Sequence, residues 1–431
     1  MSKKVYVALA ADIIHEGHIN ILKKASSYGK VIVGLLTDDA VSEYKPLPIL
    51  NYKKRLSVIS NIKFVDEVIK QETMDYRSNL RKIKPNFVIH GDDWKNGVLK
   101  KSRQQVINEL KKWSGKLIEV PYTKNISSSD IKDQIQKTTN FPVTRISRLR
   151  RLIASKKIVR VLEAHSPLAG MIAEEAKTFN SKTPEEFDCL WSSSLTESLI
   201  RGKPDNSSVP LSSRISALSD LMDATIKPVI FDADNGGRVE HLPYIINSLE
   251  RQGVSAMIIE DKIGLKRNSL FKNQSGAEQD SIEEFCKKIK KASLLKKSKD
   301  FFIVARIESF ILGKSLKDAL NRAENYSKAG ANAVVIHSKA STSKEVFSFA
   351  RKFRKSKYFV PMVAIPSSYS KTFEKELIKN GFSIVIYANH MLRASYKAMK
   401  KTAMQILKNK RSFNIEKDIS SVKEIITLKE E

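Results

Sequence analysis

The sequence predicts an α/β protein built from two blocks, a Rossmann-like parallel sheet followed by a (β/α)8 barrel of the TIM type. Short apolar runs alternate with amphipathic helical patterns along the 431 residues, which is typical of parallel sheets covered by helices. A polar stretch that contains a proline, KTTNFPV at residues 137–143, interrupts the alternation. After it the alternation repeats eight times in about 260 residues, which is the length that such a barrel needs.

The first block shows four strand-like runs separated by helical patterns. Each run is apolar over most of its length, which favours a strand buried on both faces. Serines before the last helix supply N-caps. The strands are expected at residues 4–10, 31–36, 86–90 and 116–120, and the helices at residues 17–27, 52–61, 102–113 and 128–136.

The second block shows eight strand-like runs, with amphipathic patterns such as residues 315–329 and 369–380 between them. The strands are expected at residues 160–164, 189–193, 229–232, 256–260, 301–306, 333–336, 360–364 and 384–387. We therefore expect a sheet domain at residues 1–138, a linker at 139–145, a barrel at 146–410 and a charged tail at 411–431.

Composition excludes several classes of protein. Hydrophobic residues make up 41% and charged residues 29% of the chain, which excludes a disordered or collagen-like protein. Two cysteines are too few for a disulfide framework. No apolar run is long enough to span a membrane and the start does not resemble a signal peptide, so we expect a cytoplasmic protein without a membrane partner. The net charge of +29 is spread evenly over both blocks, which predicts a lysine-rich surface and no nucleic-acid partner.

Polar side chains collect in the second block at the points where its predicted strands end. In a barrel these points face one mouth, where the loops that follow the strands form the site. Such convergence of separate loops is a stronger signal than any single motif. The strand ends read WSSSL at residues 191–195, DAD at 232–234, EDK at 260–262, ARIE at 305–308, HS at 337–338 and PSS at 366–368.

Three of these side chains are carboxylates: Asp232, Asp234 and Glu260. Mg²⁺ prefers oxygen ligands and keeps several waters, so one direct carboxylate and two that act through water would hold it. Zinc is disfavoured because no His or Cys stands beside them. Arg306 offers a planar fork for a carboxylate or phosphoryl group, and His337 could donate a hydrogen bond to an enolate oxygen.

A long loop follows the fourth strand of this block, from residue 262 to residue 280. Long loops at the mouth of a barrel often act as lids. A lid that carries Lys266 and Asn268 could close on an anion and exclude water. Spacing alone leaves an ordinary surface loop as an equal alternative.

The second block contains the segments EAHS (163–166), WSSSLT (191–196), GKPD (202–205), FDAD (231–234), GVSA (253–256), EDK (260–262), KRNSLF (266–271), ARIE (305–308), IHSK (336–339) and YANH (387–390). With these segments, residues 148–408 resemble the phosphoenolpyruvate mutase/isocitrate lyase superfamily. The pattern E-D-K-x-x-x-K-x-N-S at residues 260–269 is typical of its phosphonate-forming branch. The resemblance implies the interconversion of phosphoenolpyruvate and 3-phosphonopyruvate, which makes a carbon–phosphorus bond in phosphonate biosynthesis.

The same resemblance implies roles for individual residues. Asp232 would bind Mg²⁺ directly, while Asp234 and Glu260 would hold its waters. Asp205 would be an essential active-site carboxylate. The remaining implied residues are Trp191, Ser193, Ser194, Leu195, Arg306 and His337 around the substrate, and Lys266, Asn268 and Ser269 on a gating loop.

Two related activities compete with this interpretation. The isocitrate-lyase branch carries a Cys base on the gating loop, and residues 266–270 contain no Cys, so that branch is disfavoured. Phosphonopyruvate hydrolase shares most of the site and stays the alternative, although Asn268 favours the mutase. Ser194 stands where many relatives have Gly, and we expect activity to survive this departure.

In the first block, His15 and His18 follow the first strand and open a helix. Free N–H groups and the helix dipole at such a terminus suit nucleotide phosphates. The block resembles the cytidylyltransferase family on H-x-G-H at residues 15–18, Arg55 on the following helix, VDEV at 65–68, GDDW at 91–94 and ISSS at 126–129. The resemblance implies CTP as substrate and nucleotide-binding roles for His15, His18, Arg55, Asp92, Ser127, Ser128 and Ser129.

Two segments of the first block depart from that family. The family's G-T-F-D is LAAD at residues 9–12, and its R-T-x-G-I-S is YTKNIS at residues 122–127, without the Arg and the Gly. Two hypotheses therefore stay open, an active cytidylyltransferase that activates a phosphonate and a non-catalytic CTP-binding module. Because relatives of the second block assemble through the barrel, a homo-oligomer, dimer or tetramer, is also expected.

Overall fold

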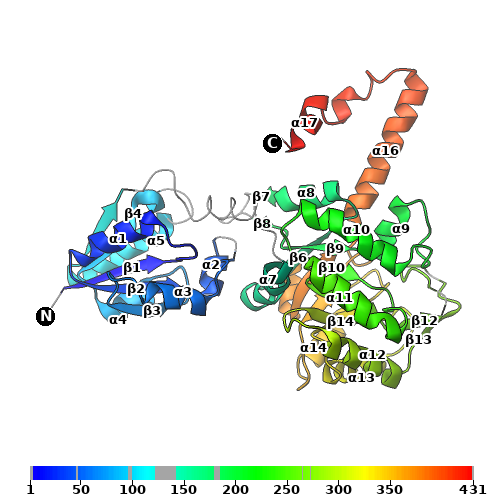
Figure 1. Ribbon diagram of the computed structural model, residues 1–431, viewed down its shortest axis with the longest axis horizontal. Coiled ribbons are helices and arrows are strands. Elements are labelled where there is room, and N and C mark those ends of the chain that lie inside the picture. The colour runs from blue at the N-terminus through cyan, green and yellow to red at the C-terminus, as the bar shows by residue number, and fades with distance from the viewer. Residues whose placement is uncertain are drawn as a thin grey trace.

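The computed structural model describes residues 3–44, 47–95, 100–121, 142–178, 185–264, 266–271 and 273–429. A five-stranded parallel sheet domain is followed by a closed parallel barrel of eight strands (Figure 1). This confirms the predicted fold class. Among the described residues, no helix is both long and apolar enough to cross a lipid bilayer.

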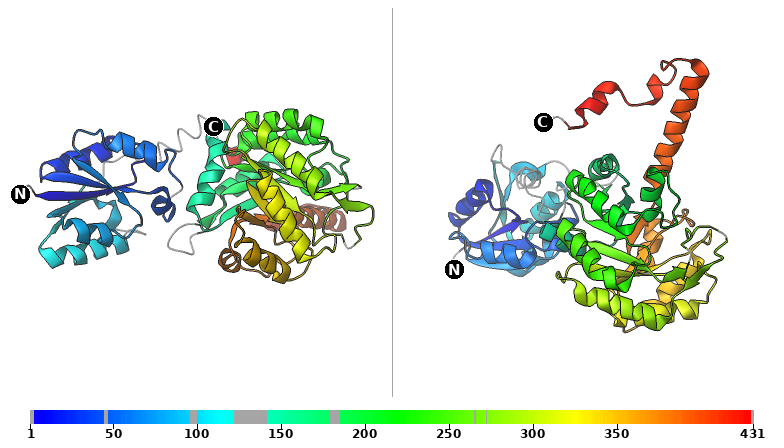
Figure 2. Two further views of the ribbon diagram at one scale, coloured as in Figure 1. Left: turned by 90° about the horizontal axis from the view of Figure 1, so that it is seen from below. Right: turned by 45° about the vertical axis from the view of Figure 1, so that its right-hand side comes forward.

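The first domain is a doubly wound sheet with strand order β3-β2-β1-β4-β5, and helices lie on both of its faces (Figure 2, left). Apolar side chains of β1 alternate between two clusters, one on each face, which is why the strand reads as a continuous apolar run. The strands are β1 (Lys4–Leu9), β2 (Lys30–Leu36), β3 (Glu67–Gln71), β4 (Phe87–Gly91) and β5 (Lys116–Val120). The helices are α1 (Glu16–Ser26), α2 (Asp38–Ser42), α3 (Tyr52–Ile59), α4 (Arg77–Ile83) and α5 (Lys100–Leu110), with short turns of 3-10 helix at η1 (Asp92–Lys95) and η3 (Lys111–Trp113).

The barrel closes with each strand parallel to its neighbours. All eight predicted strands are present within two residues of their expected bounds. Apolar side chains fill the interior, so the barrel is a packed core with its site at one mouth. The strands are β6 (Val159–Glu163), β9 (Cys189–Ser192), β10 (Val229–Asp232), β11 (Ala256–Glu260), β14 (Phe302–Ile307), β15 (Ala333–Ile336), β16 (Met362–Ala364) and β17 (Phe382–Tyr387).

Helices surround the barrel between its strands (Figures 1 and 2). The helix expected at residues 369–380 is shorter, because Phe373 is the N-cap of α15 and its amide donates to the Glu376 side chain at 2.9 Å. Tyr369, which extended the apolar pattern, is buried in the turn before it. The helices are α8 (Pro167–Glu175), α9 (Ser194–Ile200), α10 (Leu211–Ala224), α11 (Leu242–Gln252), α12 (Ile282–Leu295), α13 (Leu316–Lys328), α14 (Lys344–Phe353), α15 (Glu374–Lys379), α16 (His390–Asn409) and α17 (Val422–Ile426).

Short elements complete the chain. Two small antiparallel pairs stand beside the barrel, β7 (Lys177–Thr178) with β8 (Glu185–Glu186), and β12 (Lys262–Gly264) with β13 (Ala277–Gln279). Turns of 3-10 helix form η4 (Val239–His241), η5 (Glu416–Asp418) and η6 (Thr427–Lys429).

Helix α7 (Pro142–Ser155) connects the two domains and begins inside the segment predicted as a linker. Its Leu149 and Leu152 pack on the apolar interior of the barrel. Ser255, just before β11, donates its hydroxyl to the carbonyl of Arg145 at 2.9 Å, and Arg150 forms an ion pair of 2.8 Å with Asp300, just before β14. Because Ser255 and Asp300 lie just before the strands β11 and β14, α7 covers the amino ends of the barrel strands, opposite the mouth.

Candidate active site

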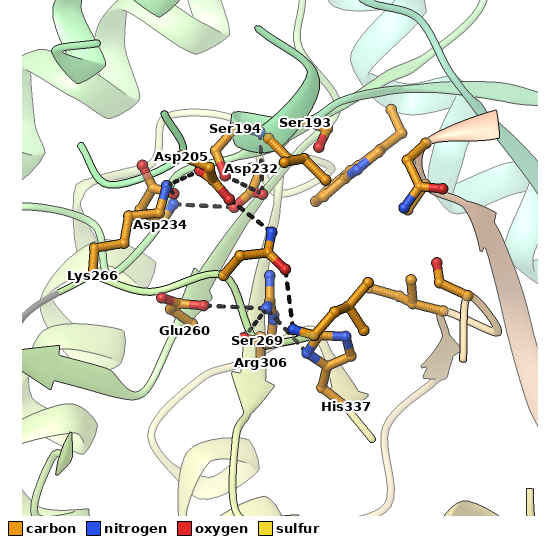
Figure 3. Close-up of a pocket in the computed structure, with 18 of the residues that line it drawn as sticks. Ser193, Ser194, Asp205, Asp232, Asp234, Glu260, Lys266, Ser269, Arg306 and His337 are labelled. Atoms are coloured by element: carbon orange, nitrogen blue, oxygen red, sulfur yellow. Dashed lines mark hydrogen bonds and ion pairs between the residues drawn. The ribbon is translucent and has the colours of Figure 1, made fainter. Parts of the chain in front are cut away.

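A cavity at the carboxyl ends of the barrel strands collects the residues that the sequence singled out in the second block (Figure 3). They come from five strand ends, from the long loop after β11 and, for Asp205, from the segment between α9 and α10. Six other residues also line the cavity; the sequence motifs contain all of them except Ile365, but none was assigned a role. The cavity is lined by the predicted Trp191, Ser193, Ser194, Leu195, Asp205, Asp232, Asp234, Glu260, Lys266, Asn268, Ser269, Arg306 and His337, and by Arg267, Leu270, Ile365, Ser367, Ala388 and Asn389.

Asp232, the last residue of β10, is buried at this cavity. The amide and the hydroxyl of Ser194 lie 3.3 Å and 3.1 Å from its Oδ2, and the amide of Asp234 donates to its Oδ1 at 3.1 Å. Burial would raise the pKa of Asp232, but Arg306 and Arg214 outweigh burial and lower it. Asp232 is therefore an ionised, well-fixed carboxylate, and the hydroxyl of Ser194 adds a hydrogen bond that glycine would lack.

Asp234 follows in a left-handed backbone conformation with φ of 52°. Such a conformation is uncommon for a residue other than glycine and is found where the surroundings hold the chain in place. The two oxygens of Asp234 bind Lys266 Nζ at 2.6 Å and Arg214 Nη1 at 3.2 Å. These ion pairs turn the Asp234 carboxylate toward Asp232 and the lid.

Glu308 is a buried residue that sequence reasoning quoted at a strand end but did not assign to the site. Its carboxylate meets Arg306 Nε at 2.5 Å, Ser269 Oγ at 2.6 Å and His337 Nδ1 at 2.9 Å. Burial would raise the pKa of Glu308, but Arg306 and then His337 outweigh it and hold that pKa well below its usual range. The signal available in the sequence was an acid that directly follows a mostly apolar strand, two residues after Arg306.

Two charged side chains lie beside Nδ1 of His337. Nδ1 of His337 lies 2.9 Å from Oε1 of Glu308, which accepts hydrogen bonds, and 3.0 Å from Nη2 of Arg306, which donates them, so each neutral tautomer of the ring has a partner at Nδ1. Burial and then Arg306 lower the pKa of His337, which keeps the ring neutral at pH 7. The neutral tautomer in which Nδ1 accepts from Arg306 carries its hydrogen on Nε2, and this form can make the expected donation to an enolate oxygen.

Glu260 ends β11 beside Arg306, whose Nη2 lies 3.3 Å from Oε2 of Glu260. Burial raises the pKa of Glu260 to about 8, with Arg306 opposing the rise and Glu308 adding to it. A cation bound next to Glu260 would favour its charged form.

The loop after β11 lies across the cavity. This position supports the interpretation of the loop as a lid, rather than as an ordinary surface loop. Strands β12 and β13 pair at the base of this loop. Lys266 Nζ binds Asp205 Oδ1 at 2.6 Å, and Asn268 Nδ2 donates to Asp205 Oδ2 at 2.8 Å (Figure 3). Lys262, a buried residue that sequence reasoning did not assign, donates to Ser269 Oγ and to the carbonyl of Arg267, both at 2.8 Å.

The donors fit a hydrated Mg²⁺ ion with one direct carboxylate ligand. Asp232, Asp234 and Glu260 line the same cavity, where they offer the oxygen ligands that Mg²⁺ prefers. Within the described ranges, no three His, Cys, Asp or Glu side chains come together as a metal cage. Mg²⁺ does not need such a cage, because it keeps several of its waters.

In the first domain, His15 and His18 lie together at the start of α1. His15 is the N-cap of that helix, and the two imidazole rings are 4.0 Å apart. The strand order reverses between β1 and β4, and ligands of open α/β sheets bind at such a point. Both histidines follow β1 and Asp92 follows β4, whereas Arg55 is fully buried and Ser127, Ser128 and Ser129 lie outside the described residues.

Family models match both domains. The model described as phosphoenolpyruvate phosphomutase matches residues 149–407, and the one described as cytidylyltransferase-like matches residues 10–134. The first match contains the whole cavity. The second contains His15, His18, Arg55 and Asp92.

Individual relatives resemble the barrel. The phosphoenolpyruvate phosphomutase of Tetrahymena pyriformis is 32% identical over 286 residues, which are 66% of this chain and 91% of that protein. A solved phosphoenolpyruvate phosphomutase from Streptomyces platensis subsp. rosaceus is 33% identical, with a TM-score of 0.60 over 66% of this chain and 94% of its own. A phosphonopyruvate hydrolase solved with oxalate and Mg²⁺ is 29% identical, with a TM-score of 0.58 and the same coverage. The chain belongs to the phosphoenolpyruvate phosphomutase family and carries an N-terminal cytidylyltransferase-like domain.

Proposed function

We propose that the barrel interconverts phosphoenolpyruvate and 3-phosphonopyruvate. The bond between phosphorus and the enol oxygen breaks, a bond between phosphorus and carbon 3 forms, and the enolate becomes a ketone. A phosphoryl group in transfer reacts readily with water, so the site must be closed while it moves. The observation that carries the proposal is the lid, because Lys266 and Asn268 both bind Asp205 and close the cavity.

Different residues of the cavity would bind different parts of such a substrate. Arg306, a cation fixed by Glu308, would bind carboxylate or phosphoryl oxygens through its fork. Ser193 and the backbone amides of Ser194 and Leu195 would bind the oxygens on the opposite side of the cavity. The chemistry then depends on positioning and electrostatic stabilisation more than on proton transfer.

Asp232 would hold Mg²⁺ directly, and Asp234 and Glu260 would bind its waters. When bound, Mg²⁺ would neutralise negative charge on the enolate and phosphoryl oxygens. The oxalate and Mg²⁺ complex of the 29% identical hydrolase supports Mg²⁺ as the metal.

Hydrolysis of phosphonopyruvate to pyruvate and phosphate is the second candidate, since a hydrolase and two mutases resemble the barrel to a similar degree. The test is to incubate the purified protein with Mg²⁺ and phosphonopyruvate and to follow the products by phosphorus NMR. The mutase converts the phosphonate signal into that of phosphoenolpyruvate, because the equilibrium should favour the phosphate ester. Inorganic phosphate together with pyruvate would identify the hydrolase.

We propose further that the first domain binds CTP at the start of α1 and transfers CMP to a phosphonate. The pair His15 and His18 at a helix N-terminus, next to the strand-order reversal, supports a site for nucleotide phosphates. The alternative is a non-catalytic module that binds CTP. Release of pyrophosphate from CTP in the presence of a phosphonate acceptor distinguishes the two.

Replacing His15 and His18 together by alanine should abolish CTP turnover and leave phosphonopyruvate turnover within about twofold of wild type. The histidines lie in the first domain, and the barrel cavity contains none of its residues. Both rates would be measured on the same preparation. A large loss of phosphonopyruvate turnover would contradict the assignment of the two histidines to a separate nucleotide site, because it would show that the barrel needs that site intact.

We propose that the chain forms a homo-oligomer in which α16 packs on a second copy. None of the residues of α16 is buried, and the helix projects from the barrel (Figure 2, right). Met399 and Leu407 on this helix are 62% and 69% exposed. Leu168 and Ile172 are exposed as well, and they lie on α8, the helix that follows β6, the strand that pairs with β17. Apolar area of this kind marks an interaction surface.

Replacing Met399 and Leu407 together by glutamate should therefore dissociate the assembly. Light scattering should give wild-type protein a mass that is a multiple of 48.7 kDa and the double variant the mass of one chain. The control is Tyr244→Glu, an equally exposed position on α11, which should keep the wild-type mass. A wild-type protein of 48.7 kDa would contradict the proposal.

A further inference from the structure

Helix α7, which packs on the barrel, also contacts the first domain. Ser42 at the end of α2 donates its hydroxyl to the carbonyl of Ser155 at 3.2 Å. Leu47 of the first domain is buried against Leu149 and Leu152 of α7. The apolar core of the barrel therefore continues into the first domain through this helix.

Arg151 is the cation at the centre of this contact. Its Nη1 donates to the carbonyl of Ile49 at 3.0 Å, its Nη2 donates to the carbonyl of Pro48, and Oδ2 of Asp38 lies 3.5 Å from Nη2. Burial lowers the pKa of Arg151, while Asp38 and Asp12 oppose that shift. Arg151 thus gives up hydration in order to hold two carbonyls and a carboxylate of the other domain.

Asp38, one of the groups that Arg151 holds, also fixes Arg55. Oδ1 of Asp38 accepts a hydrogen bond of 2.8 Å from Arg55 Nη2, so one carboxylate joins the two guanidinium groups. Arg55 is fully buried, and it also donates to the carbonyl of Leu50 at 3.1 Å and to the carbonyl of Ala10. The amide of Leu50 donates to Oδ1 of Asp12 at 3.0 Å.

Ala10 and Asp12 belong to the loop that joins β1 to His15 at the start of α1. A chain of contacts therefore runs from α7 through Arg151, Asp38 and Arg55 to the loop that precedes the histidines of the proposed nucleotide site. We propose that Arg151 is a positioning residue of the nucleotide site in the first domain, so that this site is complete only with α7 in place. The proposal rests on the proposed binding of CTP at His15 and His18.

Calorimetric titration of the full-length chain with CTP in the presence of Mg²⁺ tests it. Arg151→Met should raise the Kd for CTP by about tenfold, which is within the usual range of coupling between sites. Arg151→Lys, which keeps the charge beside Asp38, should recover part of the affinity. The matched control is Arg150→Met on the same helix, because Arg150 pairs with Asp300 of the barrel and should leave the Kd within about twofold of wild type.

Two further readouts separate positioning from a role in folding. Turnover of phosphonopyruvate, measured on the same samples, should be unchanged in Arg151→Met. Coupling is reciprocal, so CTP should slow amide hydrogen exchange in α7 of wild-type protein and leave it unaltered in Arg151→Met.

Each outcome decides the question. An unchanged Kd for CTP in Arg151→Met overturns the proposal. An equal loss of barrel turnover and CTP affinity in both Arg151 variants also overturns it, because Arg151 would then serve folding alone. If wild-type protein binds no CTP, the proposed function of the first domain itself fails, which is a different result from binding that Arg151 does not affect.

Discussion

Replacing Asp232 with alanine should lower the Mg²⁺-dependent turnover of phosphonopyruvate by about a thousandfold. Asp232 is the buried, ionised carboxylate that Ser194 and the amide of Asp234 hold in place. Without it, the proposed Mg²⁺ ion loses its direct ligand, and the charge that forms on the enolate oxygen is no longer neutralised. Initial rates by phosphorus NMR, measured across a range of Mg²⁺ concentrations, give the effect.

The control for this substitution is Asp220→Ala, which removes an exposed carboxylate from α10 and should keep wild-type turnover. Chelation of Mg²⁺ from wild-type protein should reproduce the loss seen in Asp232→Ala. Wild-type rates in Asp232→Ala would contradict the metal assignment.

Replacing Asp205 with asparagine should lower the rate of isomerisation by about a hundredfold and should raise the share of pyruvate and phosphate among the products. The Asp205 carboxylate receives Lys266 at 2.6 Å and Asn268 at 2.8 Å, so it is the point at which the lid is fastened. Asparagine keeps the shape but loses the charge and one acceptor. An open lid admits water, which competes with carbon 3 for the phosphoryl group.

Both products appear in one phosphorus NMR spectrum, so the rate and the partition are measured together. Glu278→Gln, on an exposed position of β13 at the base of the lid, removes a carboxylate without touching Asp205 and should behave as wild type. An unchanged rate and product ratio in Asp205→Asn would show that the Asp205 contacts do not matter for closure.

The barrel could be predicted from the sequence because each of its strands is an apolar run that ends in polar residues. The edge strand β3 was not predicted, since most of its side chains are exposed or half-buried and its apolar signal is weak. The helix expected at residues 369–380 was predicted too long, because buried Tyr369 extends the apolar pattern into a turn.

The candidate site could be predicted down to the strand ends, but its internal contacts could not. Nothing in the spacing shows that Glu308 joins Arg306, Ser269 and His337, because these residues come from separate strands and a loop. The role of Lys262 in holding the lid could not be predicted for the same reason, because it depends on how the loop folds back after β12. Contacts of this kind are set by tertiary packing and leave no periodic pattern in the sequence.

The position of α7 has a consequence for the order of events in the proposed pathway. This helix joins the first domain to the amino ends of the barrel strands, whereas the cavity opens at their carboxyl ends. A phosphonate made by the proposed mutase would therefore leave the barrel into bulk solvent and would not pass directly to the histidines. Other enzymes could then bind this phosphonate and modify it before the first domain joins it to CMP. The two domains would catalyse the first step and a later step of one pathway, and other enzymes would catalyse the steps between them.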